Sequence, residues 1–232
     1  AAGESALESA MKDHRLLPGF RDRTPSSWKE LAEEWRDLVA RREIQVAAPS
    51  QSVIDMTRSL DKNWSAVDIH LIPHGLPELQ GNDEVLPRER EDGRLRLIVP
   101  GRIQQGKGKQ LLLDALPAVT EYAQVYLLGA GKEGEAFFGL SGVNVVLQYQ
   151  REELPGLLAT IGPHVAALLS TVPETFSYTL SEMQQLNVPV IATRLGSFAE
   201  RIIDGDTGWL IEPEPSALAG RVRALASDRA AI

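Results

Sequence analysis

The chain has 232 residues, of which 43% are hydrophobic and none is cysteine, and its formal net charge is −8. This length fits one large domain or one domain with a piece of another, and the apolar share is too high for a disordered chain. The negative charge disfavours a general nucleic-acid binder, the lack of cysteine excludes disulfides and thiolate metal sites, and no apolar run is long enough to cross a bilayer. A cysteine-free sequence is typical of the cytoplasm, where we expect the protein. Because the sequence begins Ala-Ala-Gly, with neither Met nor a signal-peptide pattern, we expect a fragment of a longer protein.

The first 75 residues predict a few short elements. Residues 1–25 have no clear period, and we expect mainly loop there. A capping box at Ser27-Trp-Lys-Glu30 begins a helix whose apolar residues recur at helical spacing and should face a core, namely Trp28, Leu31, Trp35 and Leu38. The next expected elements are a strand at 44–48, a helix at about 52–60 and a strand at 69–72.

Residues 76–93 contain two prolines, mixed charge and no apolar period, which is typical of a linker. After the linker, short apolar runs alternate with helical patterns. The expected strands are 95–99, 124–128, 143–147, 165–169, 188–192 and 208–211, and the expected helices are 108–118, 152–161, 176–186, 198–203 and 216–227. Such alternation predicts an α/β fold with a doubly wound, Rossmann-like parallel sheet that binds ligands at the carboxyl ends of its strands.

One helix start combines features that suit a phosphate-bearing, polyhydroxyl ligand. Glu174 precedes the helix expected at 176–186, and Glu182 follows eight positions later. Backbone N–H groups in the first turn of a helix lack partners within the helix and attract phosphate, and here they belong to Ser177, Tyr178 and Thr179. Carboxylates on either side of this turn would bind hydroxyl groups.

Five motifs in a fixed order connect the chain to a known family. They are Gly101-Arg102-Ile103-Gln-Gln-Gly-Lys107-Gly108, the pair Glu174 and Glu182, Pro189-Val190-Ile191, Gly196-Ser-Phe-Ala-Glu200 and Asp204-Gly205-Asp-Thr-Gly208. Together they resemble the donor-domain signature of retaining glycosyltransferases of the GT-B fold, family four, or glycosyltransferases group 1. The resemblance covers roughly residues 66–227. Ser177 and Asn187 replace the usual glycines, and Asn tolerates a left-handed helix end nearly as well as Gly.

The resemblance implies one half of a GT-B fold. Residues 1–75 would be a remnant of the N-terminal acceptor domain, 76–93 the linker and 94–232 the nucleotide-sugar donor-binding domain. The implied enzyme is a metal-independent hexosyltransferase that uses a UDP- or GDP-linked sugar, has no other cofactor, and acts on a saccharide or lipid-linked acceptor. Bacterial polysaccharide biosynthesis is common in the family, and the full-length enzyme would be able to associate peripherally with a membrane. We expect the fragment to bind nucleotide but to turn over little or nothing.

The family's functional residues fall on matching positions of this chain. Arg102 and Lys107, in a turn after the first strand of the sheet, would stabilise the charge that develops on the leaving diphosphate. Glu182 would bind the ribose hydroxyls, Glu174 would lie near the donor sugar, and the remaining contacts to phosphate, sugar and nucleotide would come from Ser177, Tyr178, Thr179, Gly129 and Gly131. Residues 149–154 would pass near the base.

Each of these assignments has a plainer alternative. On position alone, Arg102 and Lys107 equally fit solvated surface cations. Glu182 also fits an exposed helix residue paired with Arg or Lys, Glu174 an acid favoured by the helix dipole, and Tyr178 a core residue. For Glu200 we favour a structural role, as a cap of the short helix or a brace of Arg194 or Arg201.

Two further motifs are weaker. Gly129-Ala-Gly131-Lys-Glu-Gly134 matches a dinucleotide fingerprint, but that fingerprint normally follows the first strand of a sheet, so we favour a nucleotide-sugar over NAD. The Asp204–Gly208 stretch is typical of a turn rather than a metal site. Other functions remain open, namely a sugar-nucleotide epimerase or phosphorylase on the same fold, or a non-catalytic interaction module with a decayed donor site.

Overall fold

The computed structural model describes residues 24–41, 44–60, 62–76, 78–79 and 84–232. Most of the loop expected for residues 1–25 lies outside this range. The described chain divides into two compact units. The smaller contains 24–48 and Ile54–Ile72, and the larger contains Pro49–Val53 and Pro73–Ile232. The expected domain boundaries near residues 75 and 93 stay a prediction.

The smaller unit contains a two-stranded parallel sheet. Its elements are α3 (Pro25–Arg41), β1 (Val46–Ala48), most of α4 (Gln51–Leu60), the 3₁₀ helix η1 (Lys62–Ala66) and β2 (Ile69–Leu71). The two helices and two strands expected here are confirmed. The expectation that Trp35 and Leu38 face a core is wrong, because these side chains are 56% and 40% exposed. Two strands of three residues offer too little apolar surface to bury a whole helix face.

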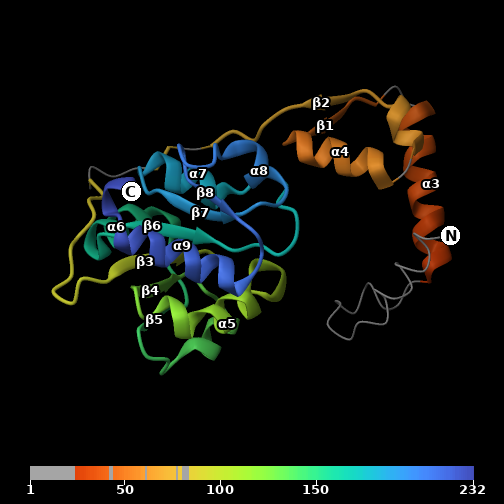
Figure 1. Ribbon diagram of the computed structural model, residues 1–232. Helices are drawn as coiled ribbons and strands as arrows, with labels where there is room; N and C mark the ends of the chain where they lie inside the picture. The colour runs from red at the N-terminus through yellow and green to blue at the C-terminus, as the bar shows by residue number, and fades with distance from the viewer. Residues whose placement is uncertain (1–23, 42–43, 61, 77, 80–83) are drawn as a thin grey trace. The chain divides into compact units, whose positions relative to one another are not determined.

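The larger unit is built on a six-stranded, wholly parallel sheet (Figure 1). Across the sheet the strands are β5 (Val143–Val146), β4 (Ala123–Leu128), β3 (Leu95–Pro100), β6 (Val165–Leu168), β7 (Val190–Thr193) and β8 (Trp209–Ile211). The doubly wound α/β fold expected from the sequence is confirmed, with every strand within two residues of its expected bounds. The chain runs outward from β3 to β5 and then returns to β6. The switch point therefore lies between the central strands β3 and β6, and such sheets bind ligands at the carboxyl ends of the strands beside it.

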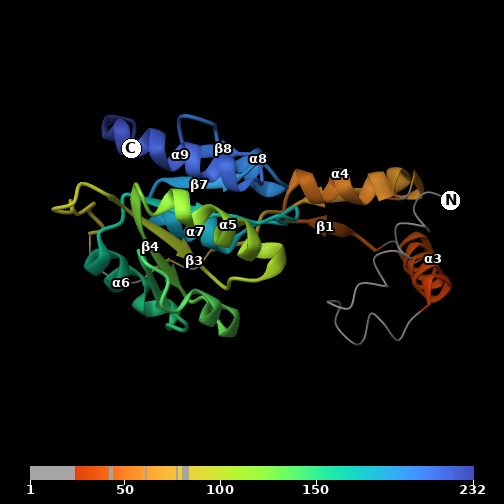
Figure 2. The same cartoon turned by 60° about the horizontal axis from the view of Figure 1, so that its bottom comes forward.

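Helices cover both faces of this sheet (Figure 2). On one face lie α5 (Lys109–Val119) and α9 (Pro215–Ser227), and on the other lie α6 (Leu154–Ile161), α7 (Tyr178–Gln185) and α8 (Ser197–Arg201). Short 3₁₀ helices complete the unit: η2 (Gln105–Lys107), η3 (Lys132–Phe137), η4 (Arg151–Glu153) and η5 (Arg229–Ala231). None of the helices in the described part of the chain is long and apolar enough to span a membrane.

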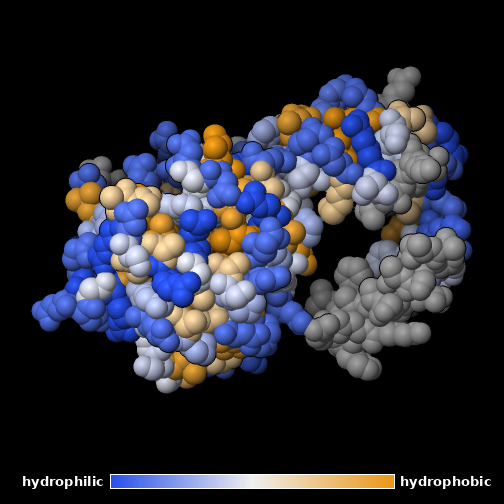
Figure 3. Space-filling model, viewed as in Figure 1, coloured by the Kyte–Doolittle hydropathy of each residue, from blue (hydrophilic) through white to orange (hydrophobic). Residues whose placement is uncertain are grey.

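Burial on both faces explains the near-continuous apolar strands. In β3, Leu97 points into the cluster with α5 and α9, whereas its neighbour Ile98 points into the cluster with α6, α7 and α8. Both side chains have no exposed surface. On the face seen in Figure 3, hydrophobic residues of the larger unit form only scattered patches among hydrophilic ones.

A buried histidine lies at the amino-end side of the sheet. The Nδ1 atom of His164 accepts a hydrogen bond of 3.0 Å from the backbone N–H of Arg96, so the proton of the neutral ring is on Nε2. The Nε2 atom lies 3.5 Å from both a Glu89 carboxylate oxygen and the Arg229 guanidinium. Burial, and then the positive charge of Arg96, lower the pKa of His164.

Candidate functional site

Two loops meet where β3 and β6 end. The backbone N–H of Thr171 donates to the carbonyl of Gly106 at 2.9 Å, and the Ser170 hydroxyl donates to the same oxygen at 3.1 Å. Gly108 has a φ of +79°, and a Cβ atom there would lie 2.1 Å from the carbonyl oxygen of Leu169. The loop after β3 therefore depends on a glycine to lie directly against the loop after β6.

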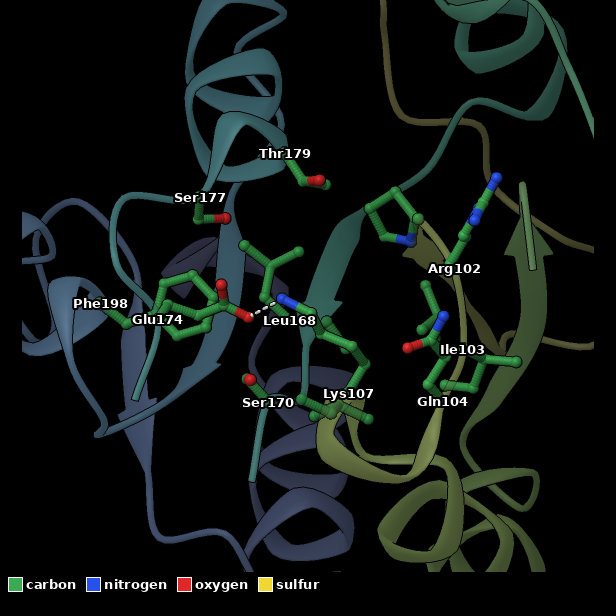
Figure 4. Close-up of a pocket in the computed structure, with 15 residues that line it drawn as sticks. Arg102, Ile103, Gln104, Lys107, Leu168, Ser170, Glu174, Ser177, Thr179 and Phe198 are labelled. Carbon is green, nitrogen blue, oxygen red and sulfur yellow. Dashed lines mark hydrogen bonds and ion pairs between the residues drawn. The ribbon is translucent and has the colours of Figure 1, made fainter. Parts of the chain in front are cut away.

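A first cavity of about 220 Å³ opens between these loops (Figure 4). Its lining includes Arg102, Lys107, Glu174, Ser177 and Thr179. The Lys107 ammonium donates to a carboxylate oxygen of Glu174, and this pair crosses the cavity. The Glu174 side chain is only 12% exposed, whereas that of Lys107 is 48% exposed. A half-exposed ammonium is thus held by a nearly buried carboxylate inside the cavity.

A second cavity of about 870 Å³ shares the residues 101–104 with the first. It is lined by Gly129, Gly131, Tyr149, Arg151 and Glu182, among others. The Glu182 residue is 8% exposed, and its carboxylate accepts a hydrogen bond of 2.8 Å from the Arg151 guanidinium. The alternative of an exposed Glu182 is therefore wrong, although its pairing with an arginine is confirmed.

Tyr149 covers the glycine turn of the second cavity. A Cβ atom on Gly129 would lie 2.7 Å from the Tyr149 ring, so this close approach requires glycine. Burial, and then the negative charge of Glu182, raise the pKa of the Tyr149 phenol. Of the stretch 149–154, which we expected near the base, Tyr149 and Arg151 line the same cavity as Glu182.

Arg102 lies where the two cavities join, because it lines both. Its guanidinium makes no hydrogen bond or ion pair with any other residue in the described part of the chain. Figure 4 shows its side chain pointing away from the pair formed by Lys107 and Glu174. The structure therefore brings both cations and both glutamates to one edge of the sheet, with Arg102 and Lys107 directed to different parts of it.

The helix after Glu174 begins at Tyr178, two residues later than expected. Ser177 is its N-cap, with a φ of +65°, and the Ser177 hydroxyl accepts a hydrogen bond of 3.2 Å from the backbone N–H of Leu180. This backbone conformation suits the glycine that the family resemblance implies at the position. Asn187 at the other end of the helix has a φ of +53°, as its left-handed tolerance predicted.

Tyr178 lines neither cavity. Its ring is 50% exposed and stacks on the ring of His74, with centroids 5.4 Å apart and planes inclined by 12°. The alternative that Tyr178 is a core residue is wrong. Any contact of Tyr178 with a ligand in the first cavity would come from its backbone N–H, since neighbouring Ser177 and Thr179 line that cavity.

Glu200 does not cap α8. Instead its carboxylate accepts hydrogen bonds of 3.2 Å and 2.8 Å from the backbone N–H groups of Gln51 and Ser52, which belong to the larger unit. Arg194 pairs with Asp204 at 2.7 Å rather than with Glu200. The hydrogen bond that Asp204 accepts from the backbone N–H of Leu210, and then the one from Arg194, lower the pKa of Asp204.

The stretch from Asp204 to Gly208 forms the expected turn, with Gly205 at a φ of +85°. Within the described residues, no group of three or more His, Asp or Glu side chains could hold a metal ion.

Comparison with known proteins agrees with this geometry. The family model described as glycosyl transferases group 1 matches residues 94–228, more than half of the chain. The chain belongs to the glycosyl transferases group 1 family. The family and the fold expected from the sequence are thereby confirmed.

The group 1 relatives include bacterial enzymes. A D-inositol 3-phosphate glycosyltransferase of Arthrobacter sp. strain FB24 is 30% identical over 137 residues, which cover 54% of this chain and 32% of the relative. An enzyme of the same description from Geodermatophilus obscurus is 30% identical over 191 residues, which cover 68% of this chain and 40% of the relative. The chain spans less than half the length of these two relatives.

Solved structures share the fold of this group 1 chain. Sucrose-phosphate synthase from Thermosynechococcus elongatus has a TM-score of 0.62 at 23% identity, over 80% of this chain and 50% of that one. HepE of Anabaena, in complex with UDP-glucose, has a TM-score of 0.62 at 18% identity, over 81% of this chain and 55% of that one. At these identities the likeness concerns the fold alone.

Sequence reasoning missed Arg201, which contacts the loop that carries Glu174 and Ser177. Its guanidinium donates to the carbonyl of Phe176, to the carbonyl of Ser177 at 3.2 Å and to the Ser181 hydroxyl at 2.6 Å. No periodic pattern marks this residue, because its partners lie 17 to 25 positions earlier in the chain.

Proposed function

We propose that the chain is the donor-binding domain of a retaining, metal-independent glycosyltransferase. It would hold a UDP- or GDP-linked sugar for transfer to a saccharide or lipid-linked acceptor. One observation carries this proposal: Arg102, Lys107, Glu174 and Glu182 lie with the start of α7 around two joined cavities at the switch point of the sheet. Cations and a helix start suit a diphosphate, and carboxylates suit hydroxyl groups.

The second cavity would take the nucleoside. The buried Glu182 carboxylate would bind the two ribose hydroxyls while Arg151 fixes its orientation. The backbone of Gly129 and Gly131 would contact the nucleotide, and Tyr149, which packs against Gly129, would lie near the base. The size of this cavity, about 870 Å³, falls within the range of small-molecule sites.

The diphosphate would lie where the cavities join, beside Arg102, which has no partner among the described residues. The sugar would then enter the first cavity, beside Glu174. Lys107 would exchange its carboxylate partner for a phosphate oxygen, since its side chain is flexible and half exposed.

In the transfer step, the bond between the anomeric carbon and the phosphate oxygen would break, and its electron pair would remain on the diphosphate. Arg102, Lys107 and the first turn of α7 would stabilise the added negative charge without a metal ion. The acceptor hydroxyl would attack from the face that the diphosphate leaves, and its proton would pass to the leaving phosphate oxygen, so that the anomeric configuration is retained.

The relatives support a wider setting for this activity. HepE holds UDP-glucose on a similar fold, and the named relatives of the chain are bacterial glycosyltransferases. We therefore propose a bacterial, cytoplasmic enzyme of polysaccharide biosynthesis, with peripheral membrane association through parts outside this chain. Residues 1–75 would be the end of the acceptor-binding domain, so the chain alone would bind donor but transfer little sugar.

Calorimetric titration of the 232-residue chain with UDP and with GDP tests the proposal. We expect one of the two to bind, and Arg102→Ala to weaken that binding at least about tenfold, because a charge-assisted contact is lost. Arg223→Ala, on an exposed turn of α9, is the matched control and should leave binding unchanged. No binding of either nucleotide, or equal binding by Arg102→Ala, would contradict the proposal. Product analysis would then separate transfer from epimerisation or phosphorolysis in the longer protein.

A further inference from the structure

Arg201, the last residue of α8, ties α8 to the beginning of α7. One guanidinium nitrogen, Nη1, donates to the carbonyls of Phe176 and Ser177. The other, Nη2, donates to the Ser181 hydroxyl at 2.6 Å and lies 3.4 Å from the Gln184 side-chain oxygen. The guanidinium also lies over the Phe176 ring, 4.3 Å from its centroid. One side chain thus fixes the N-cap, the residue before it and the first turn of the helix.

The tethered segment needs external support. Ser177 has a φ of +65°, a conformation that disfavours any residue with a side chain. Its hydroxyl already caps the helix, and the Ser181 hydroxyl is buried. Arg201 is partly buried, and this burial lowers its pKa. The two terminal nitrogens of the guanidinium bind the carbonyl pair and the Ser181 hydroxyl at the same time, in a fixed geometry that a lysine ammonium does not provide.

The tether also sets the direction of two donor groups. In a trans peptide the N–H points opposite to the carbonyl of the same peptide unit. When Arg201 holds the carbonyls of Phe176 and Ser177, the N–H groups of Ser177 and Tyr178 must point away from it. Within the described chain, neither N–H donates a hydrogen bond to another residue. Both remain free for a phosphate or sugar oxygen.

We propose that Arg201 is a positioning residue for the donor, one that acts through the backbone of Phe176 and Ser177. It would not touch the nucleotide-sugar itself. It would hold the start of α7 in the shape that presents N–H groups to the diphosphate, with Glu174 close behind. This inference rests on the proposed function of the site, but the tether itself is a property of the protein without ligand.

Arg201→Met removes the donors and keeps much of the side-chain length, and Arg201→Lys keeps the charge without the fork. Hydrogen–deuterium exchange of the ligand-free chain should become at least about tenfold faster over residues 174–181 in Arg201→Met, and remain unchanged in α5. The affinity for UDP or GDP, whichever binds, should fall by about tenfold, while affinity for the matching monophosphate should change less than twofold. For Arg201→Lys, both the exchange rate over residues 174–181 and the diphosphate affinity should lie between the values of the wild type and of Arg201→Met. If Arg201→Met does not fold, Arg201→Lys alone provides the test. Arg223→Met is the control.

If the variants exchange over residues 174–181 at the wild-type rate, Arg201 does not hold this segment, and the inference is wrong. Faster exchange there with unchanged diphosphate affinity would show a merely structural role and overturn the inference about the donor. Equal losses for the diphosphate and monophosphate would overturn it as well, because the effect would not be confined to the start of α7. A failure of the proposed function looks different: the wild-type chain would bind neither nucleotide, and the donor role of Arg201 would fall with it even if exchange changed as expected.

Discussion

The two parallel sheets of this chain are buried to very different extents. In the larger unit, every residue of β6, β7 and β8 is buried, and helices cover both faces of the sheet. In the two strands of the smaller unit, only Ala48 of β1 and Ile69 of β2 are buried. Half of the large hydrophobic residues exposed in the described chain belong to this smaller unit: Trp35, Leu38, Ile44, Met56, Leu71 and Ile72. A parallel sheet becomes a core only when its strands are numerous enough for two helical layers to cover them.

The buried sheet of the larger unit should therefore provide most of the stability, and it also carries the proposed site. The loops that carry Arg102, Lys107 and Glu174 extend from the buried strands β3 and β6, so their backbone is fixed by a complete core. The smaller unit leaves apolar side chains in water, and its contribution to stability should be small.

The largest test compares matched leucines in the two units. Leu97→Ala, at a site with no exposed surface, should lower the free energy of unfolding by about 3 kcal/mol, because it leaves a cavity in the main core. Leu71→Ala, at a site 50% exposed, should lower it by less than about 0.5 kcal/mol. Urea unfolding measures both values. Equal losses of unfolding free energy in the two variants would show that the smaller unit has a core as important for stability as that of the larger unit.

Ligand binding should act on the larger unit alone. At a free nucleotide concentration of 100 times the dissociation constant, UDP or GDP should stabilise the larger unit by about 2.7 kcal/mol, because only its folded form binds. Hydrogen–deuterium exchange with and without nucleotide should therefore slow in β3 and β6 and stay the same in α3. Equal slowing in both units would show that the smaller unit also contributes to binding.

Two glycines of the larger unit, Gly108 and Gly220, should differ in their tolerance of a side chain. Gly108→Ala should cost at least about 2 kcal/mol, because the position combines positive φ with a clash against the Leu169 carbonyl. Gly220→Ala, in α9 with open space around it, should stabilise the chain by about 0.5–1 kcal/mol. Thermal unfolding of both variants distinguishes these outcomes, and tolerance of Gly108→Ala would mean that the two loops are not held together as described.

The smallest effect concerns pH. The pKa of His164 is lowered in the folded chain, so below its unfolded value of about 6.5 the unfolded chain binds more protons than the folded one. Stability should therefore be unaffected by this group above pH 6.5 and fall below it, by at most about 1.4 kcal/mol per pH unit. The facing charges are Arg96, Glu89 and Arg229. His164→Gln should flatten the dependence between pH 6.5 and 5 in urea unfolding, and an unchanged slope would assign the effect to other groups.

Much of the larger unit could be predicted from sequence, because its strands are short apolar runs and its helices have clear spacing. The motif order also indicated that Lys107 and Glu174 would belong to one donor site, since both follow strands whose carboxyl ends share one edge, but it did not predict their ion pair. The exposure of Trp35 could not be predicted, because helical spacing identifies an apolar face but not whether a surface exists to cover it. Arg201 was missed for a related reason: its contacts join two helices whose approach depends on the whole sheet.

The most direct test of the site is a crystal structure of the chain with the nucleoside diphosphate that binds in solution. We expect a diphosphate between Arg102 and the first turn of α7, with the ribose at Glu182 and the Lys107 ammonium moved from Glu174 to about 3 Å from a phosphate oxygen. A diphosphate bound away from Arg102 and α7, with the Lys107–Glu174 pair intact, would contradict it.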